Sequence, residues 1–462
     1  MTKNMKNMTL ANIAKAVNGS LHNAEQHVGE EAAGVVLDSR KVEAGYVFIA
    51  TKGERVDGHT FIDAVFEKGA LGVICEKAPE NPKGAYIVVE DSFQALKDVA
   101  AFYRKQLNIK VVGITGSVGK TTTKEMIALV LSEKYKTLKT QGNLNNEIGL
   151  PKTLFNLDSS YQAAVIEMGM SDFGEIERLS NTAVPTIGVI TNIGFSHIEN
   201  LKSQEGILKA KLEILSGMKS DAPLIVNGDD RYLAPLKLEL KSSRSVYLYG
   251  TGDKCDFRAK NIIEENGITR FTLVYNGVNT EIEIPCAGKH NVLNASAAFC
   301  VGILSGLNEN EIVSALKKYK SDGMRQNIVK KGDKTVIIDC YNASPDSMKA
   351  TLNVLADMKC KGRKIAVLGD MLELGDMSEK LHRLVGEYAA QCHPDRLYCY
   401  GENAMYIAAE ASEHGLASCA FHKDSKDLMA EKIKEDLQSG DIILFKASRG
   451  MKLEEVIDKI FG

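Results

Sequence analysis

The sequence predicts an α/β protein of three domains, and three observations lead to this class. A β-branched apolar run at residues 111–114 passes through a glycine-rich turn into a helical pattern, which is typical of a buried parallel strand and its crossover helix. Strand-like and helix-like stretches alternate again from about Gly323 to the C-terminus, as in a doubly wound sheet. The length of 462 residues fits about three domains.

We predict the following domain order. A small α/β domain covers residues 1–108, and a central parallel-sheet domain with a region of antiparallel hairpins covers residues 109–322. A C-terminal doubly wound domain covers residues 323–462. The hairpins are expected in the turn-rich stretch at residues 245–285, which contains Asn266-Gly267 and Asn276-Gly277.

The composition is that of an ordinary globular protein, with 44% hydrophobic and 25% charged residues. The 57 basic and 60 acidic residues give a net charge of −3, so no bulk attraction to nucleic acid or to an anionic membrane is expected. The nine cysteines are scattered and form no C-x-x-C pair, as in a reducing compartment. Neither a signal peptide nor an apolar run of membrane-spanning length is apparent. We expect a cytoplasmic monomer.

The first domain contains two polar loops that follow predicted strands. The strand at residues 35–37 leads into Asp38-Ser39-Arg40, and the strand at residues 46–50 leads into a loop with two glycines. Such loops either grip a phosphate or nucleotide or are ordinary turns, and the sequence leaves both open. The candidate binding residues are Ser39, Arg40, Lys52, Gly53, Asp57 and His59.

The turn after residues 111–114 has the features of a phosphate-binding loop. Gly116 and Gly119 allow positive φ and a close approach of phosphate, and the following helix adds the positive end of its dipole. Lys120 would contact the β and γ phosphates, and the Thr121 hydroxyl would ligate Mg²⁺. Ile114 stands where the general motif has glycine. The alternative is a glycine turn before a surface helix. The residues expected around the phosphates are Gly116, Ser117, Val118, Gly119, Lys120, Thr121 and Thr122.

A loop rich in asparagine follows at residues 142–151. Asparagines interleaved with glycine present amides to a ligand, or one of them caps the helical pattern that opens at Pro151. The candidates here are Asn143, Asn145, Asn146 and Glu147.

Three further polar residues of the central domain are candidates. Glu167 ends an apolar strand, where a carboxylate can face a nucleotide, although a surface glutamate is the simpler alternative. His197 follows the strand at residues 185–190 and fits a metal or phosphate position or an ordinary polar contact. Lys211 has apolar helical neighbours that favour burial, or its stem snorkels to solvent.

In the third domain, polar loops follow the strands at residues 336–339, 365–370 and 442–446. The carboxyl ends of parallel strands are where open α/β sheets bind ligands. The loop residues Asn342, Ser448 and Arg449 are candidates for contact with a substrate.

Taken together, these motifs resemble the Mur ligase superfamily over essentially the whole chain. The segments that carry the resemblance are residues 38–40, 52–59, 115–122, 142–149, 167–169, 192–197, 209–214, 288–294, 339–347 and 446–452. The stretch Tyr341-Asn342-Ala343-Ser344-Pro345-Asp346-Ser347-Met348 is similar to that of the members that join D-alanyl-D-alanine to UDP-N-acetylmuramoyl-tripeptide. Ser344 stands where these members are expected to have asparagine.

The resemblance implies a UDP-binding first domain, an ATP-binding central domain and a Rossmann-like third domain that closes over the amino acceptor. It implies cytoplasmic peptidoglycan precursor synthesis, in which a tripeptide carboxylate attacks the γ-phosphate of ATP and the D-alanyl-D-alanine amine displaces phosphate from the acyl phosphate. Two Mg²⁺ ions would be held by Thr121, Glu167, His197 and Lys211. A lysine cation cannot ligate Mg²⁺, but Lys211 resembles the family lysine that becomes an N-carboxylated carbamate, which turns the cation into an oxygen ligand.

The resemblance also assigns roles to single residues. Asn291, Arg325 and Asp339 are expected at the adenine and ribose, and Lys120, Glu167, His197 and Lys211 are expected to be catalytic. One alternative is another ligase of the superfamily, such as a folylpolyglutamate synthase, against which the complete first domain and residues 341–348 argue. The other is a P-loop nucleotide switch, against which the absence of an Asn-Lys-x-Asp motif argues.

Overall fold

The computed structural model describes residues 4–265, 267–321 and 323–462. Asn266 of the predicted turn and Asp322 at the predicted domain boundary lie outside these residues, and the domain boundaries stay predictions. The chain forms two compact units. Unit 1 takes the described residues up to Thr115 together with Lys134–Val189 and Leu212–Leu224, and unit 2 takes Gly116–Glu133, Ile190–Lys211 and Ile225–Gly462. The predicted α/β class is confirmed.

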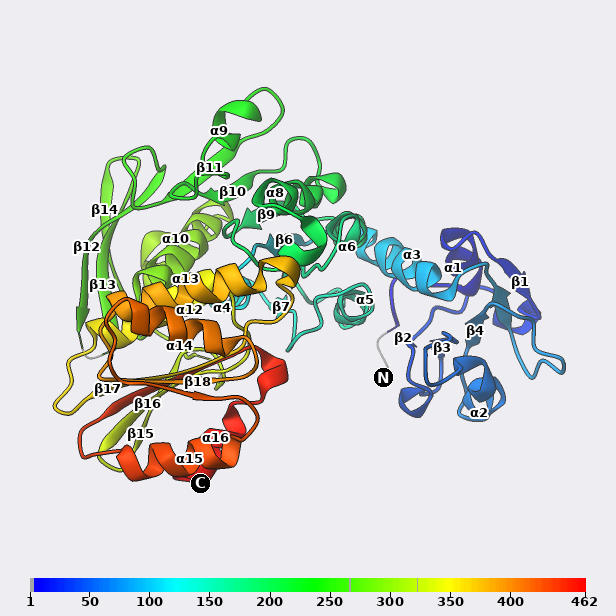
Figure 1. The fold of residues 1–462 in the computed structure, drawn as a ribbon. Coiled ribbons are helices and arrows are strands. Elements are labelled where there is room, and N and C mark those ends of the chain that lie inside the picture. The colour runs from blue at the N-terminus through cyan, green and yellow to red at the C-terminus, as the bar shows by residue number, and fades with distance from the viewer. Residues whose placement is uncertain (1–3, 266, 322) are drawn as a thin grey trace. The chain divides into compact units, whose positions relative to one another are not determined.

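The N-terminal part of unit 1 is a five-stranded sheet with three helices (Figure 1). Its order is β1 (Ser20–His22), β5 (Tyr86–Val88), β4 (Gly72–Cys75), β3 (Tyr46–Ile49) and β2 (Gly34–Val36). Only β1 pairs antiparallel to its neighbour. The helices are α1 (Leu10–Ala16), α2 (Ile62–Glu67) and α3 (Ser92–Lys105). The central strands are continuous apolar runs because both faces of the sheet are covered.

Unit 1 also carries four strands of the central region. Their order is β9 (Ile187–Ile190), β6 (Lys110–Thr115), β8 (Ala163–Glu167) and β7 (Thr137–Lys139), with α5 (Gly149–Leu154) and α6 (Glu175–Ala183). β8 pairs parallel to both β6 and β7 and is buried throughout. Arg104 on α3 is 5% exposed and donates hydrogen bonds to the carbonyls of Ala183 and Leu107, so α3 is fixed to this layer.

Unit 2 begins with the helix that follows β6 and then takes up the second half of the central region. Its helices here are α4 (Lys120–Ser132), α7 (Ile198–Leu201), α8 (Gln204–Leu212), α9 (Leu236–Glu239), α10 (Lys289–Leu304) and α11 (Glu309–Leu316). The strands run β10 (Leu224–Asn227), β11 (Val246–Gly250), β12 (Phe257–Glu265), β13 (Ile268–Tyr275) and β14 (Val278–Ile284).

The predicted antiparallel hairpins are confirmed for β12, β13 and β14 but not for β11. β11 pairs parallel to β12, through Tyr249 opposite Phe257 and Gly250 opposite Arg258. The connection can return in the same direction because Asp229 accepts hydrogen bonds from the amides of Thr251 and Gly252 and folds it into a tight loop.

The last part of unit 2 is the C-terminal sheet, defined here as β15–β20. Its order is β15 (Asn327–Lys331), β16 (Lys334–Asp339), β20 (Ile442–Lys446), β17 (Lys364–Gly369), β18 (Arg396–Tyr400) and β19 (Cys419–His422). β15 is antiparallel and the other pairs are parallel. Figure 1 shows α12 (Pro345–Asp357), α13 (Ser378–Gln391) and α14 (Ala404–Glu413) on one face, and α15 (Lys426–Asp436) and α16 (Glu454–Phe461) on the other. The predicted doubly wound sheet is therefore confirmed.

Short 3-10 turns occur in the loops of both units. They are η1 (Glu25–His27), η2 (Ser39–Lys41), η3 (Gly58–Phe61), η4 (Glu213–Gly217), η5 (Gly375–Met377) and η6 (Arg449–Met451). Among the described helices, none combines the length and the apolar character that crossing a bilayer requires.

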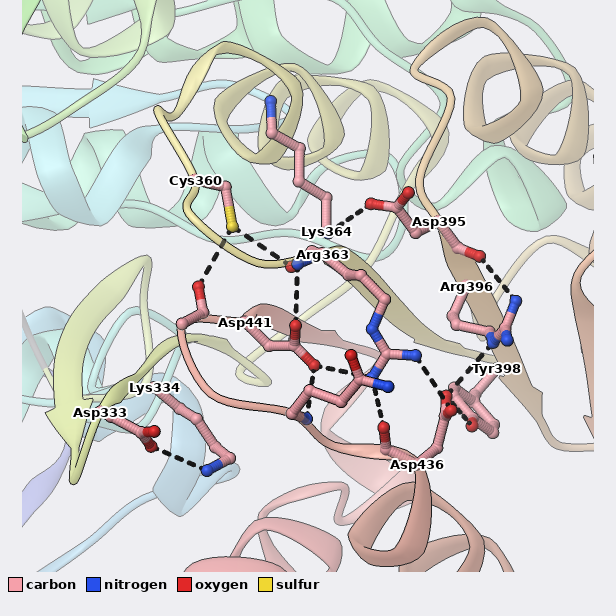
Figure 2. A network of polar contacts seen from close by, with 12 residues as sticks. Asp333, Lys334, Cys360, Arg363, Lys364, Asp395, Arg396, Tyr398, Asp436 and Asp441 are labelled. Atoms are coloured by element: carbon pink, nitrogen blue, oxygen red, sulfur yellow. Dashed lines mark hydrogen bonds and ion pairs between the residues drawn. The ribbon is translucent and has the colours of Figure 1, made fainter.

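A network of ion pairs around the buried carboxylate of Asp441 lies at the amino-terminal ends of the strands in the C-terminal sheet (Figure 2). Asp441, whose side chain is fully buried, accepts hydrogen bonds at 2.8 Å from the Arg363 amide, from Arg363 Nη2 and from the Gln438 amide. Arg363 Nη1 also donates to Asp436 at 3.0 Å, and Asp436 in turn accepts from Tyr398. This network lies at the end of the sheet opposite the loops that follow β16, β17 and β20.

Candidate phosphate-binding and ligase site

The loop between β6 and α4 requires glycine at two positions. Gly116 has φ +147°, and a Cβ there would lie 1.8 Å from Thr191 Oγ1. Gly119 has φ +83°, and a Cβ there would lie 2.8 Å from Asn294 Oδ1. Side chains other than hydrogen would both strain the backbone and displace these neighbours. The loop therefore has the shape that the sequence predicted for it.

The first amides of this loop are bound by protein. The Ser117 amide donates to Asn192 O at 3.1 Å, and the Val118 amide donates to Asn192 Oδ1 at 2.9 Å. In this structure these two amides therefore do not point into an anion nest. The amides of the first turn of α4 lie further along, and Gly119 at the N-cap has no side-chain oxygen to satisfy them. The helix end is thus the part of the loop suited to an anion.

Lys120 folds back over the loop. Its Nζ donates to Gly116 O at 2.8 Å and to Ser117 O at 3.3 Å. Thr121 is 7% exposed at the start of α4, and Thr122 hydrogen-bonds to Tyr319. A positive charge, a helix N-terminus and hydroxyl groups therefore lie within a few residues of one another, as binding of a polyphosphate requires.

Lys211 is buried on α8, with 1% of the residue exposed. Burial, together with the positive charge of Lys120, holds the pKa of its amine well below the ordinary value. Of the two predicted alternatives, the buried side chain is confirmed and the snorkelling one is wrong. Burial therefore favours the neutral amine over the ammonium form relative to a solvated lysine.

His197 lies in a loop that contacts the C-terminal sheet. It adopts φ +61°, and its Nδ1 is 2.8 Å from Glu373 Oε2 in the loop after β17. The hydrogen bond from His197 lowers the pKa of the Glu373 carboxyl. In the same loop the Phe195 amide donates to Asp346 Oδ2 at 3.3 Å. Burial raises the pKa of Asp346.

A chain of hydrogen-bonded polar side chains runs from Thr123 in the first turns of α4 to Gln326, just before β15. Thr123 Oγ1 donates to Asn294 Oδ1 at 3.0 Å, and Asn294 Nδ2 donates to Asn291 Oδ1 at 3.1 Å. Asn291 is 4% exposed, and its Nδ2 donates to Ala287 O at 2.7 Å and to Gln326 Oε1 at 2.9 Å. Both the amide nitrogen and the amide oxygen of Asn291, the residue predicted to contact adenine, are thus hydrogen-bonded within the protein.

Arg325 lies just before β15, and Asp339 is the last residue of β16. The Arg325 guanidinium stacks on the Tyr341 ring at 3.8 Å, and its buried Nε has no hydrogen-bond partner among the described residues. Asp339 Oδ2 accepts from Lys446 Nζ at 2.6 Å and from Thr351 Oγ1 at 2.7 Å. An unsatisfied buried donor beside an aromatic ring is a position at which a ligand oxygen would be stabilised.

In unit 1, Glu167 is 2% exposed at the end of β8, and its Oε1 accepts from Asn145 Nδ2 at 2.9 Å. Asn146 Oδ1 accepts from the Gly149 amide at 2.8 Å at the start of α5, whose N-cap residue is Ile148. Glu147 forms ion pairs with Lys97 at 3.1 Å and with Arg178 at 2.5 Å. Asn146 therefore binds the first amide of α5 from outside the N-cap position, and the alternative of a helix cap stays a prediction. Asn143, whose carbonyl accepts from the Asn145 amide, shapes the same loop.

The polar loops of the first sheet are held by local bonds. Arg40 pairs with Asp38 at 2.9 Å, which lowers the pKa of Asp38 to about 2, and most of the Arg40 side chain is exposed. His59 Nε2 accepts from the Glu76 amide, so Nδ1 carries the proton donated to Asp57. The other candidates lie in these two loops: Ser39, whose carbonyl accepts from Lys68, and Lys52 and Gly53 beside the bridge to Asp57.

The candidates of the C-terminal sheet differ in exposure. Ser448 is 3% exposed, and its Oγ accepts from the Leu372 amide at 3.0 Å. Asn342 Oδ1 accepts from the Ala343 amide, and Arg449 pairs with Glu454 at 2.6 Å while half of its side chain is exposed. Ser344 is the N-cap of α12 in a capping box with Ser347.

Two residues that the sequence pattern did not single out belong to this arrangement, Glu373 and Gln326. Glu373 follows a predicted parallel strand, so its position was a usable signal. Gln326 offers none, because its role depends on partners distant in sequence. In the part of the chain that the structure describes, no group of three or more His, Cys, Asp or Glu side chains is placed to hold a metal.

Family models match three consecutive parts of the chain. The Mur ligase family, catalytic domain, matches residues 31–114, the Mur ligase middle domain residues 114–302, and the Mur ligase, glutamate ligase domain, residues 324–449. The UDP-N-acetylmuramoyl-tripeptide--D-alanyl-D-alanine ligase of Bacillus subtilis is 42% identical over 97% of both chains. The Escherichia coli ligase of the same name is 34% identical over 98% of both chains.

Solved structures agree with these matches. A crystal structure of MurF from Acinetobacter baumannii has a TM-score of 0.89 at 32% identity and covers 98% of both chains. MurF from Thermotoga maritima in complex with ADP has a TM-score of 0.83 at 30% identity and covers 92% of this chain and 96% of its own. By full-length sequence identity, by three consecutive family models and by fold, this chain belongs to the Mur ligase family.

Proposed function

We propose that this protein is an ATP-dependent ligase that joins D-alanyl-D-alanine to UDP-N-acetylmuramoyl-tripeptide, as a step of cytoplasmic peptidoglycan precursor synthesis. The observation that carries the proposal is 42% identity over 97% of the chain to the Bacillus subtilis ligase of that name. ATP as the energy source is supported by the ADP complex of the Thermotoga maritima relative. A folylpolyglutamate synthase structure is only 17% identical and supports the fold alone.

The reaction has two steps in this proposal. The terminal carboxylate of the tripeptide attacks the γ-phosphorus of ATP, and the bond from that phosphorus to the β,γ-bridging oxygen breaks. The products of this step are ADP and the acyl phosphate of the tripeptide. The amine of D-alanyl-D-alanine then attacks the acyl carbon, loses a proton and displaces inorganic phosphate. Because carboxylate and ATP are both anionic, the first step depends on positive charge at the phosphates.

The chain's own groups supply much of that compensation. Lys120 lies over the loop carbonyls and would exchange them for β- and γ-phosphate oxygens. The first turn of α4, with Gly119 at its N-cap, would bind the same phosphates through its amides. Arg325, with its unsatisfied Nε, would bind the nucleotide together with Asp339. For Asn291, whose amide is in use, we propose support of the Arg325 segment through Gln326.

We propose that two Mg²⁺ ions act here, which would screen the phosphate charges when bound. Thr121 and Glu167 would hold one ion, and His197, Glu167 and Lys211 the other. An ammonium group cannot ligate Mg²⁺, but burial of the Lys211 amine lowers its pKa and so favours the neutral form, which would take up CO₂ as a carbamate with oxygen ligands. Isotope-labelled bicarbonate should therefore label Lys211, and a Lys211→Ala variant should lose both label and activity.

The remaining candidates are proposed substrate contacts. The loops with Ser39, Arg40, Lys52, Gly53, Asp57 and His59 would bind the UDP group. The loop with Asn143, Asn145, Asn146 and Glu147 would line the tripeptide side. Asn146 shapes this loop through its hydrogen bond from the Gly149 amide, and Glu147 shapes it through its ion pairs. Asn342, Ser448 and Arg449 would meet D-alanyl-D-alanine. We also propose that the protein acts as a monomer, which light scattering of the purified chain would test.

The decisive experiment measures ADP release and amide product with D-alanyl-D-alanine and each UDP-tripeptide in turn, carrying L-lysine or diaminopimelate at the third position. Amide should form with one of them, and a Lys120→Ala variant should lose at least about a hundredfold in rate. A Lys241→Ala variant, which removes an exposed lysine, is the matched control. Absence of amide with both substrates, or product from Lys120→Ala at the native rate, would overturn the proposal.

A further inference from the structure

The start of α12 and the loop after β17 contact the segment at residues 194–201. Asp346, the second residue of α12, accepts from the Phe195 amide, and a Cβ at Gly194 would lie 2.2 Å from the same carboxylate oxygen. A Cβ at Gly375, in the loop after β17, would lie 2.8 Å from Glu199 Cγ. The contacts are close-packed at both points, so the segment that carries His197 is fitted to the loops of the C-terminal sheet.

A polar contact between the segment at residues 194–201 and the loop after β17 joins two residues with strained backbones. His197 Nδ1 lies 2.8 Å from Glu373 Oε2, and both residues have left-handed backbones, with φ +61° and +63°. Non-glycine residues persist in this conformation where the surrounding structure holds them, and such residues cluster at functional sites. The His197 side chain is 20% exposed and the Glu373 side chain 61% exposed, so the histidine is the more enclosed of the two partners.

The loop of Glu373 is held by bonds on the side of β17. His382 is fully buried, its Nε2 accepts from the Met371 amide at 3.0 Å, and its Nδ1 is 2.8 Å from Ser378 O. The next amide, that of Leu372, donates to Ser448 Oγ at 3.0 Å. The two residues before Glu373 are thus fixed by buried side chains, which directs the carboxylate towards His197.

We propose that Glu373 is a positioning residue for His197: by accepting the Nδ1 proton it fixes the ring and presents the Nε2 lone pair to the second Mg²⁺ ion. This inference rests on the proposed function. A carboxylate that holds the far nitrogen of a metal-binding histidine fixes both its tautomer and its orientation. Mg²⁺ prefers oxygen ligands, so binding of the ion by the His197 nitrogen would depend strongly on the orientation of the imidazole ring. The ligands of the second ion would be fully oriented only while the loop after β17 contacts His197.

The test uses the full-length protein with a non-hydrolysable ATP analogue and UDP-tripeptide, and counts bound Mn²⁺ by electron paramagnetic resonance. The native protein should bind two ions. Glu373→Ala should weaken the second ion by about 10- to 100-fold and leave the first unchanged. The affinity of Glu373→Gln for the second ion should lie between those of the native protein and Glu373→Ala, because the glutamine amide oxygen still accepts the Nδ1 proton. Glu379→Ala, which removes an exposed carboxylate paired with Arg383 on α13, should behave as the native protein.

A second readout needs no metal. Side-chain NMR of histidine-labelled protein, with His197→Gln to assign the signal, should report the Nδ1–H tautomer in the native protein and a mixture in Glu373→Ala. Equal affinity for the second ion in Glu373→Ala, an unchanged tautomer, or a native protein that binds one ion would each overturn the inference. Amide formation by the native protein is scored separately, so failure of the proposed function is recognised on its own.

Discussion

Replacing Arg363 by methionine should destabilise the C-terminal sheet strongly, because it leaves a buried carboxylate without its countercharge. The Asp441 side chain is fully buried and accepts three hydrogen bonds, of which only the one from Arg363 Nη2 is charged. The two backbone bonds survive the substitution. Methionine is long enough to fill the space of the arginine stem, so the loss is chiefly electrostatic.

The expected magnitude follows from that geometry. Removing one partner of a buried ion pair costs about 3–5 kcal/mol. Since two amides still bind Asp441, we expect the lower end, about 3 kcal/mol, which is a drop in Tm of roughly 10 °C for a region of this size. Arg396→Met is the matched control: Arg396 pairs with Asp436 in the same network, but at 3.3 Å and with 41% of its side chain exposed. Such a pair contributes about 0.2–1 kcal/mol.

The assay is calorimetry on both variants, with hydrogen exchange to localise the change to β17, β18 and β20. The reasoning is refuted if Arg396→Met loses as much as Arg363→Met, or if Arg363→Met stays within a few degrees of the native Tm. The first outcome would mean that exposure does not separate the two ion pairs, and the second would mean that solvent reaches Asp441 and compensates its charge.

Three other predictions follow from single contacts. Gly116→Ala should lower ATP affinity by at least about tenfold in calorimetric titration, since its Cβ would meet Thr191 Oγ1 at 1.8 Å; unchanged affinity would contradict the loop geometry. Ser344→Ala should cost about 1 kcal/mol in chemical denaturation while Ser344→Asn retains the cap, and equal losses would argue against capping. Burial lowers the pKa of His382, so the side chain takes up a proton more readily when it is exposed than when it is buried against the loop after β17. The contact between His382 and this loop should therefore weaken as pH falls below about 6.5. Protection of the Met371 amide from exchange should then fall with pH, and should do so less in His382→Gln.

Features that depend on neighbouring residues were predictable from the sequence. The glycine spacing at residues 116–119 and the apolar runs before it gave the loop and its helix, because backbone conformation and burial leave a local signal. The apolar neighbours of Lys211 on its helix favoured the burial that the structure has. The same reasoning applies to the alternation that predicted the C-terminal sheet.

Features that depend on distant partners were not predictable. The carboxylate of Glu147 pairs with Lys97 and Arg178, which lie far along the chain in both directions, so no local pattern separates an ion pair from a ligand contact. The parallel pairing of β11 depends in the same way on Asp229 folding the connection. Glu373 contacts His197 only because two sheets' loops meet there.

The bond between Asp339 and Lys446 has a practical consequence for handling the protein. Lys446 ends the last strand and is almost completely buried, and its ammonium group is the countercharge for an acid on β16. A truncation that removes β20 would strip that acid of its cation beside the expected ribose position. Extensions after Gly462 leave the pair intact, so affinity tags belong at this end of the chain, and deletions do not.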